Sequence, residues 1–210
     1  MAIRVDPPRV EARASGRTIC RLSPRDEARW RALADRAAPL IEARLPDGVV
    51  ADRAVRQRHG WRLAPMRPAL RRARRAAASL AREGAVVATD VEAFFPSVTP
   101  ETLERALLAV GAARGDAAAA ASMLGGWAEQ GRAGLPVGPA ASSILANAVL
   151  LPVDLAVAPV RFLRWVDDYL LPAEYPLERF DEALAVVGLR RSERKTVRGI
   201  GGVWQAPYGR

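Results

Sequence analysis

Apolar residues recur at helical spacing in two segments of the N-terminal half. Between residues 26 and 45 they fall every three or four positions, which predicts a helix that begins near Ser23 and Pro24. Residues 68–82 are rich in alanine and have the same spacing. The short segment GRTICRL, which precedes the first helix, is extended in character and predicts a strand.

The second half of the chain alternates between strand and helix patterns. An apolar run from Val86 ends near Asp90 and predicts a short buried strand. Thr99 and Pro100 then provide an N-cap and a first helical residue for a helix that reaches about Val110. The pattern next predicts a helix over residues 116–130, a loop rich in glycine and proline over 131–139, and a long apolar helix from residue 140 to 149 or beyond Pro152.

The segment RFLRWVDDYLLP, residues 161–172, predicts a β-hairpin with Asp167 and Asp168 in its tight turn. A helix over 177–187 and a weak last strand near Leu189 complete the pattern. The order in this half is strand, helices, strand, strand, helix, strand, which is typical of a ferredoxin-like antiparallel sheet. The predicted fold class is therefore α+β, with the helices on one face of the sheet, in a chain that forms a single compact unit.

The chain is strongly basic. Lys and Arg total 32 against 23 Asp and Glu, which gives a formal net charge of +9 over 210 residues. This balance indicates a polyanionic partner, nucleic acid rather than a membrane, unless the charge only solvates the surface. Residues 53–82 hold ten arginines and no acid. Because apolar residues lie between the arginines, the helix predicted there has a basic face that suits a phosphate backbone.

Several residue types are scarce, which narrows the chemistry. One cysteine and one histidine exclude an internal disulfide and leave no basis for a cysteine or histidine metal cluster. Lys195 is the only lysine, so it stands out in a chain that otherwise uses arginine. The N-terminus has no signal-peptide core, and the most apolar segment, residues 144–160, contains Asn147, Pro152 and Asp154. A soluble cytoplasmic protein with no membrane partner is expected.

Two adjacent carboxylates in an apolar hairpin are costly to bury without a compensating partner. At the turn, Asp167 and Asp168 could both lie at one edge of the sheet, opposite the strand that ends at Asp90. Carboxylates that converge in this way form an oxygen-rich site that suits Mg²⁺. Two such ions about 3.5–4 Å apart are the arrangement used for nucleotidyl transfer, and they would compensate for the burial of the acids.

The second half also contains four segments in the order TDVEAFFPSV, GLPVGPAASSILAN, RWVDDYLL and GLRRSERKT. In this order they resemble the palm motifs of reverse transcriptases, the bacterial kind found in retrons, group II introns and defence-associated systems. SGRTICRLSPRDEARWRAL is similar to the fingers segment of the family. The resemblance covers roughly residues 15–198. It implies an RNA-directed DNA polymerase with a basic fingers-like region over 1–84, a palm over 85–198 and a tail over 199–210.

The resemblance assigns the acids to metal binding. Asp90 and Asp167 would ligate two Mg²⁺ ions, for which Mn²⁺ could substitute, and the carbonyl of Val91 would help to hold one of them. Asp168 would be a third, weaker acid. The implied partners are an RNA template, a DNA or RNA primer and dNTPs.

Other positions are implied to contact the nucleotide. Phe95 is at the position of an aromatic steric gate that favours deoxynucleotides, and Gly138 lies in the loop of the second motif, which shapes the nucleotide and template pocket. Arg17 or Arg21 would meet the phosphates. Lys195 would lie near the triphosphate and could assist the pyrophosphate leaving group as a cation or acid.

The sequence departs from the family pattern in three places. Trp165 replaces the usual Tyr of the third motif, and Val137 replaces a frequent Gln of the second. Only fifteen residues follow Lys195, which is too short for a helical thumb, so a partner protein or a structured RNA is expected to supply it, unless the chain is a fragment or synthesis is not processive.

Other functions stay open from sequence alone. One is a degenerate palm that binds nucleic acid or a partner without catalysis. Another is untemplated or protein-primed nucleotide addition in an antiviral system. A nucleotidyl cyclase is weaker, since the GLPVGP loop and Phe95 would have no role in it.

Overall fold

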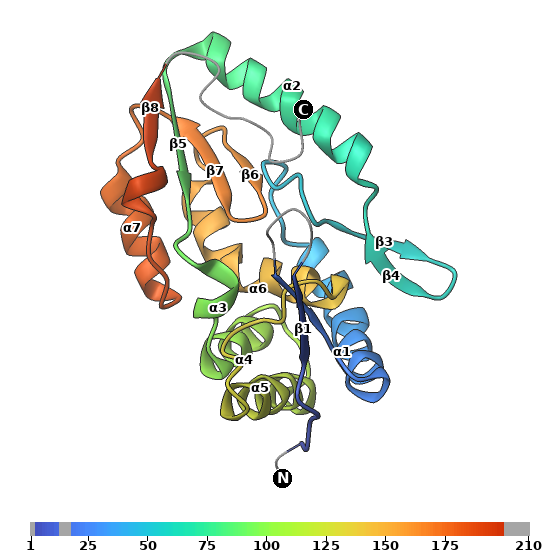
Figure 1. Ribbon diagram of the computed structural model, residues 1–210. Helices are drawn as coiled ribbons and strands as arrows, with labels where there is room; N and C mark the ends of the chain where they lie inside the picture. Colours follow the sequence, from blue (N-terminus) through green and yellow to red (C-terminus); the bar gives the residue numbers. More distant parts are fainter. Residues whose placement is uncertain (1–2, 13–17, 200–210) are drawn as a thin grey trace. The chain divides into compact units, whose positions relative to one another are not determined.

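The computed structural model describes residues 3–12 and 18–199 and has an α+β fold with small antiparallel sheets (Figure 1). The chain divides into two compact units. The helical unit comprises Met1–Arg44, Ala54–Leu63 and Ala93–Leu151, and the sheet unit comprises Leu45–Arg53, Ala64–Glu92 and Pro152–Arg210. Both units are therefore assembled from separate segments, whereas the sequence predicted consecutive regions with a boundary after residue 84.

The helical unit contains two β-hairpins and several helices. Its elements are β1 (Arg9–Ala12), β2 (Thr18–Arg21), α1 (Pro24–Glu42), β3 (Ala54–Gln57), β4 (Gly60–Leu63), α3 (Phe94–Ser97), α4 (Pro100–Ala109), α5 (Arg114–Glu129) and the first part of α6 (Ala140–Val157). The predicted N-caps are present, because the hydroxyls of Ser23 and Thr99 accept hydrogen bonds from the backbone N–H of Asp26 and Thr102. The core is centred on Trp30 and Trp127, whose ring centroids lie 5.2 Å apart.

The glycine- and proline-rich loop over 131–139 is tied to the rest of the helical unit by its backbone. The N–H of Cys20 in β2 donates to the carbonyl of Val137 at 2.6 Å, and the N–H of Leu135 donates to the carbonyl of Phe95 at 2.8 Å. Gly134 has a φ of +79°, and a Cβ at this position would lie 2.1 Å from the Phe95 carbonyl oxygen. Only glycine fits so close an approach of two backbones.

The sheet unit is built on an antiparallel sheet with the strand order β6-β7-β5-β8. Its strands are β5 (Val86–Asp90), β6 (Leu163–Trp165), β7 (Asp168–Pro172) and β8 (Val197–Gly199). The strand near Asp90 and the hairpin are as predicted, and β5 pairs with β7 along its whole length. The central strands are buried on both faces, which explains why they read as continuous apolar runs rather than alternating ones.

The prediction of a last strand near Leu189 is wrong. Gly188, with a φ of +74°, follows α7 (Leu177–Val186), and the N–H groups of Gly188 and Leu189 donate to the carbonyls of Ala185 and Leu184. Leu189 therefore belongs to a Schellman-type C-cap, where an apolar residue normally packs back against its helix. The last strand of the sheet is instead β8, which pairs with β5.

Helices cover both faces of this sheet, not one (Figure 1). On one face, α2 (Met66–Glu83) packs Ala69, Ala73 and Leu80 against a cluster that includes Leu170 of β7. On the other face, the ring of Tyr169 lies 4.9 Å from that of Phe180 in α7. From the sequence, the segment of α2 belongs to the basic N-terminal region and not to the sheet. The layer that α2 forms on one face of the sheet was therefore not predicted.

Among the described residues, α6 is the one helix long and apolar enough for a membrane span by length and composition. Within the protein, 72% of that segment is buried. Burial of this kind is typical of the core helix of a soluble protein, and it agrees with the expectation drawn from Asn147, Pro152 and Asp154.

Candidate active site

The three predicted acids lie together at one end of the sheet unit. Asp90 is the last residue of β5 and is paired in register with Asp168, the first residue of β7. Asp167 immediately precedes Asp168 in the hairpin loop, and its carbonyl accepts a hydrogen bond from the N–H of Val91 at 3.2 Å. Asp90 is buried and the other two acids are half-buried. The structure therefore brings together the residues that the sequence singled out.

The hairpin turn that carries Asp167 is strained. Strands β6 and β7 pair through Trp165 and Asp168, so Val166 and Asp167 form a two-residue loop. Val166 has a φ of +59°, a conformation for which hairpins normally use glycine and which is costly for a β-branched residue. Backbone strain of this kind costs about 1–3 kcal/mol and persists only where surrounding contacts enforce it.

A buried network of polar side chains holds this turn in its strained conformation. The Arg164 guanidinium donates to the Val166 carbonyl at 2.7 Å and to both carboxylate oxygens of Asp154 at 2.8 Å. The Tyr169 hydroxyl also donates to Asp154, at 2.8 Å. Burial raises the pKa of the Asp154 carboxyl, and the bidentate guanidinium opposes this rise. The network thus joins α6, β6 and β7 directly behind the loop.

Burial and mutual repulsion perturb the acids of the hairpin. Burial raises the pKa of Asp167 to about 6, and the negative charge of Asp90 adds to the rise. Burial likewise raises the pKa of Asp168 to about 7, with further contributions from Asp167 and from Asp90, to which the Asp168 carboxyl is hydrogen-bonded. Such raised values are expected where buried carboxylates converge, and the positive charge of Lys195 offsets the rise only in part.

Lys195 faces the acids from a separate segment of the sheet unit. Its ammonium lies 2.7 Å from Oδ2 of Asp90, and this hydrogen bond raises the pKa of the lysine. The residue ends a short 3-10 turn, η1 (Glu193–Lys195). The next side chain, Thr196, donates to the Ser192 carbonyl and lies 2.8 Å from the hydroxyl of Thr89 in β5. The turn is therefore fastened to the strand that carries Asp90.

The donor set fits Mg²⁺ in type, because Asp90, Asp167 and Asp168 offer hard carboxylate oxygens whose repulsion a cation would relieve. Across residues 3–12 and 18–199, however, no group of three Asp, Glu, His or Cys side chains is arranged to hold a metal ion. Lys195 engages Oδ2 of Asp90 instead. The binding of metal would require these side chains to reorient, so the expected magnesium site stays a prediction.

The remaining predicted contacts lie in the helical unit, apart from Arg17, which lies outside the described residues. Gly138, with a φ of +120°, and Arg21 line one small pocket of about 70 Å³. Arg21 is exposed and pairs with Glu11 at 3.1 Å. Phe95 is half-buried in α3, and its ring centroid lies 5.4 Å from that of Phe94. Their proposed roles toward a nucleotide stay predictions.

Sequence reasoning missed the network behind the turn. A signal was present, since Asp154 is the lone acid of an apolar helix and Arg164 stands between Leu163 and Trp165 in an apolar strand. Charges of opposite sign in two segments that are otherwise buried are expected to pair. Taken alone in the sequence, Asp154 indicates only that its helix is a poor membrane span.

No protein-family model matches the chain, and a search of curated proteins finds no match to it. The interpretation of the site therefore depends on the ordered motifs and on the geometry at the end of the sheet.

Proposed function

We propose that the chain is an RNA-directed DNA polymerase of the reverse-transcriptase type, with the sheet unit as its palm. The observation that carries the proposal is the convergence of Asp90, Asp167, Asp168 and Lys195, from three separate segments, at one end of an antiparallel sheet. The motifs that supply these residues occur in the order typical of reverse transcriptases. The strand–helix–strand order of the sheet also supports the assignment of a palm.

In this proposal Asp90, Asp167 and Asp168 hold two Mg²⁺ ions, for which Mn²⁺ could substitute. When bound, such ions supply activation of the primer 3′-hydroxyl and neutralisation of the triphosphate. Lys195 is held as a cation beside Asp90, where it can neutralise charge on the departing pyrophosphate. The substrates are an RNA template, a DNA or RNA primer and dNTPs, and a cytoplasmic location belongs to the same proposal.

Primer extension on an RNA template tests the proposal. The wild-type chain and Asp47→Asn are expected to incorporate dNTPs, whereas Asp167→Asn falls to background. Asp47 is a matched control, because it is an exposed aspartate of the same sheet unit. Equal incorporation by wild type and Asp167→Asn, or none by any of the three, would reject a polymerase centred on this hairpin. Omission of the template from the same assay identifies untemplated addition.

A second candidate is nucleic-acid or partner binding without catalysis. It is favoured by the ion pair between Lys195 and Asp90 and by the absence of a ready metal arrangement among the described residues. Titration with Mn²⁺ separates the candidates. A polymerase should bind Mn²⁺ in wild type and lose that binding in Asp90→Asn, whereas a binding module should show no binding that depends on Asp90.

A further inference from the structure

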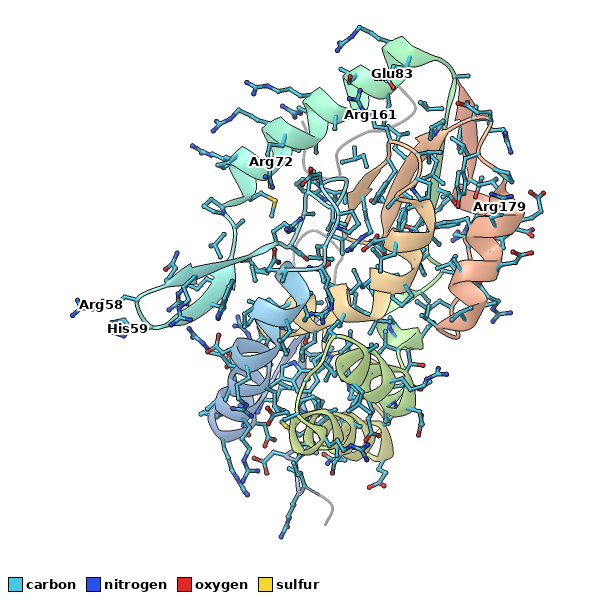
Figure 2. All side chains as sticks on the ribbon, turned by 180° about the vertical axis from the view of Figure 1, so that it is seen from behind. Arg58, His59, Arg72, Glu83, Arg161 and Arg179 are labelled. Carbon is cyan, nitrogen blue, oxygen red and sulfur yellow. The ribbon has the colours of Figure 1, made fainter. Side chains whose placement is uncertain are left out.

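Helix α2 has two sharply different faces. Ala69, Ala73 and Leu80 are buried against the sheet. The remaining surface of the helix carries exposed arginines, namely Arg67, Arg71, Arg72, Arg74, Arg75 and Arg82. Figure 2 labels one of them, Arg72, on α2. At 1.5 Å per residue, this basic face extends over about 22 Å from Arg67 to Arg82.

The charge of this face is not neutralised within the described part of the chain. None of the six arginines forms an ion pair or a side-chain hydrogen bond there. Glu83, the one acid of the helix, is paired with Arg161, and Figure 2 shows the two side chains together near the end of α2. A row of free guanidinium groups without local counter-charges is arranged for a polyanion.

We propose that the exposed arginine face of α2, Arg67 to Arg82, is a docking surface for the phosphate backbone of a nucleic acid. Guanidinium groups match phosphate oxygens in bidentate geometry, and a polymer with a regular charge repeat complements the length of the face. A membrane surface is disfavoured because the apolar side of the helix is buried in the core and cannot enter a bilayer.

The composition of the face also determines what it can recognise. Helix α2 contains no aromatic residue, so it offers no platform for base stacking. Its contacts would be to phosphates alone, which fix position but carry no sequence information. Binding is therefore expected to be independent of sequence and to weaken steeply as salt increases.

Helix α2 packs on the side of the sheet to which two of the acids belong. Side chains alternate along a strand, so Asp90 shares a face with Val86, and its partner Asp168 shares that face with Leu170. Val86 and Leu170 belong to the cluster against which α2 packs. A backbone held along α2 would thus run on the side of the sheet unit to which Asp90 and Asp168 belong. The inference deepens the proposed function and rests on it for this arrangement.

The test is fluorescence anisotropy with a labelled RNA–DNA hybrid of mixed sequence, measured over a range of salt. Arg71→Gln/Arg75→Gln is compared with Arg105→Gln/Arg179→Gln, which removes two charges from exposed positions on α4 and α7. Glutamine keeps the helix propensity high, and circular dichroism verifies that both variants are folded. The α2 variant is expected to bind about tenfold more weakly, with a salt slope reduced by about two.

The control variant is expected to bind within about twofold of wild type. Equal weakening in both double variants, or wild-type affinity in the α2 variant, would overturn the proposal, and so would stronger binding to anionic lipid vesicles than to the hybrid. The measurement is repeated in Asp47→Asn, an exposed position away from the acids, which should bind like wild type. Because binding does not need synthesis, a failure of primer extension with intact α2-dependent binding would reject only the polymerase.

Discussion

The guanidinium of Arg164 and the carboxylate of Asp154 form a bidentate pair, with both nitrogen–oxygen distances at 2.8 Å and both side chains fully buried. The same guanidinium donates to the carbonyl of Val166. The pair therefore links the end of α6 to the strained loop that presents Asp167. A buried ion pair is rarely the most stabilising choice for a core, so its value here is better explained by the position that it gives to the turn.

The first prediction concerns the stability of this pair. Asp154→Asn leaves the Arg164 charge buried and uncompensated, and we expect the free energy of unfolding to fall by about 3–5 kcal/mol. Tyr169→Phe removes one hydrogen bond to Asp154 and should cost about 1 kcal/mol. Urea unfolding at neutral pH measures both. Equal costs for the two variants would contradict a dominant role of the ion pair.

A second prediction separates the effect of the ion pair on protein stability from its effect on the position of Asp167. In Asp154→Leu/Arg164→Met both charges are removed, so stability should recover to within about 2 kcal/mol of wild type. The Val166 carbonyl, however, loses its donor, and Asp167 loses its fixed position. We therefore expect this folded double variant to bind Mn²⁺ more weakly and to lose primer extension. Wild-type Mn²⁺ affinity in the double variant would show that the turn keeps its geometry without the pair.

A third prediction concerns pH. The pKa of Asp168 is about 7 in the folded protein, against a usual value of 3.8, so between these values the folded state holds more protons than the unfolded chain. The free energy of unfolding should consequently fall as the pH rises from about 4 to 7. Asp168→Asn removes this penalty. In metal-free buffer at pH 8 it should be roughly 1–2 kcal/mol more stable than wild type, since solvent screens the half-buried carboxylate.

Thermal unfolding scans at pH 4 and pH 8 measure this effect. The advantage of Asp168→Asn is expected at pH 8 and should vanish near pH 4, where both proteins are neutral at this position. Asp47→Asn provides the control for a general change in net charge. A constant difference at the two pH values would indicate a packing effect of the amide rather than titration.

A fourth prediction concerns Lys195, which would compete for Asp90 with the metal ion of the proposed function. Lys195→Ala frees Oδ2 of Asp90 and removes a positive charge from the site, so the affinity for Mn²⁺ should rise by a few-fold. Primer extension should nevertheless fall, because the cation proposed to face the pyrophosphate is lost. Calorimetric titration and a single-turnover assay measure the two changes. Parallel loss of both would indicate that Lys195 only supports the fold.

A fifth prediction concerns the loop over 131–139. Gly134→Ala places a Cβ 2.1 Å from the Phe95 carbonyl oxygen, so the two backbones must separate, and we expect a loss of about 3 kcal/mol or more. Gly131→Ala is the matched control. Gly131 has a nearly identical φ of +78° but open space around it, so its cost should stay near 1 kcal/mol. Denaturant unfolding compares the two.

Local signals were sufficient for most elements of the fold. The N-caps at Ser23 and Thr99, the buried strand that ends at Asp90 and the hairpin over 161–172 depend on neighbouring residues, and all are present in the structure. The division into units was not predictable in this way, since the packing of α2 on the sheet is a long-range contact. The false strand at Leu189 arose because an apolar C-cap residue has the same local pattern as the start of a strand.

For the candidate site, too, the sequence predicted the local features but not the long-range contacts. Its acids and Lys195 were found because chemistry made them unusual in the sequence. The support beneath them was not found, because Arg164 and Asp154 become partners only when α6 and β6 pack together.

Asp90 and Asp168 also stand at the ends of two strands that are buried on both faces. In β5, Val86 and Val87 face opposite sides of the sheet and are both buried, and in β7 the same holds for Tyr169 and Leu170. Amide hydrogens in such strands exchange with solvent mainly through global unfolding. Native-state hydrogen exchange should therefore rank these amides among the slowest of the chain. Asp90 and Asp168 would accordingly keep their spacing through every smaller fluctuation, and any adjustment of the site must come from side-chain rotation.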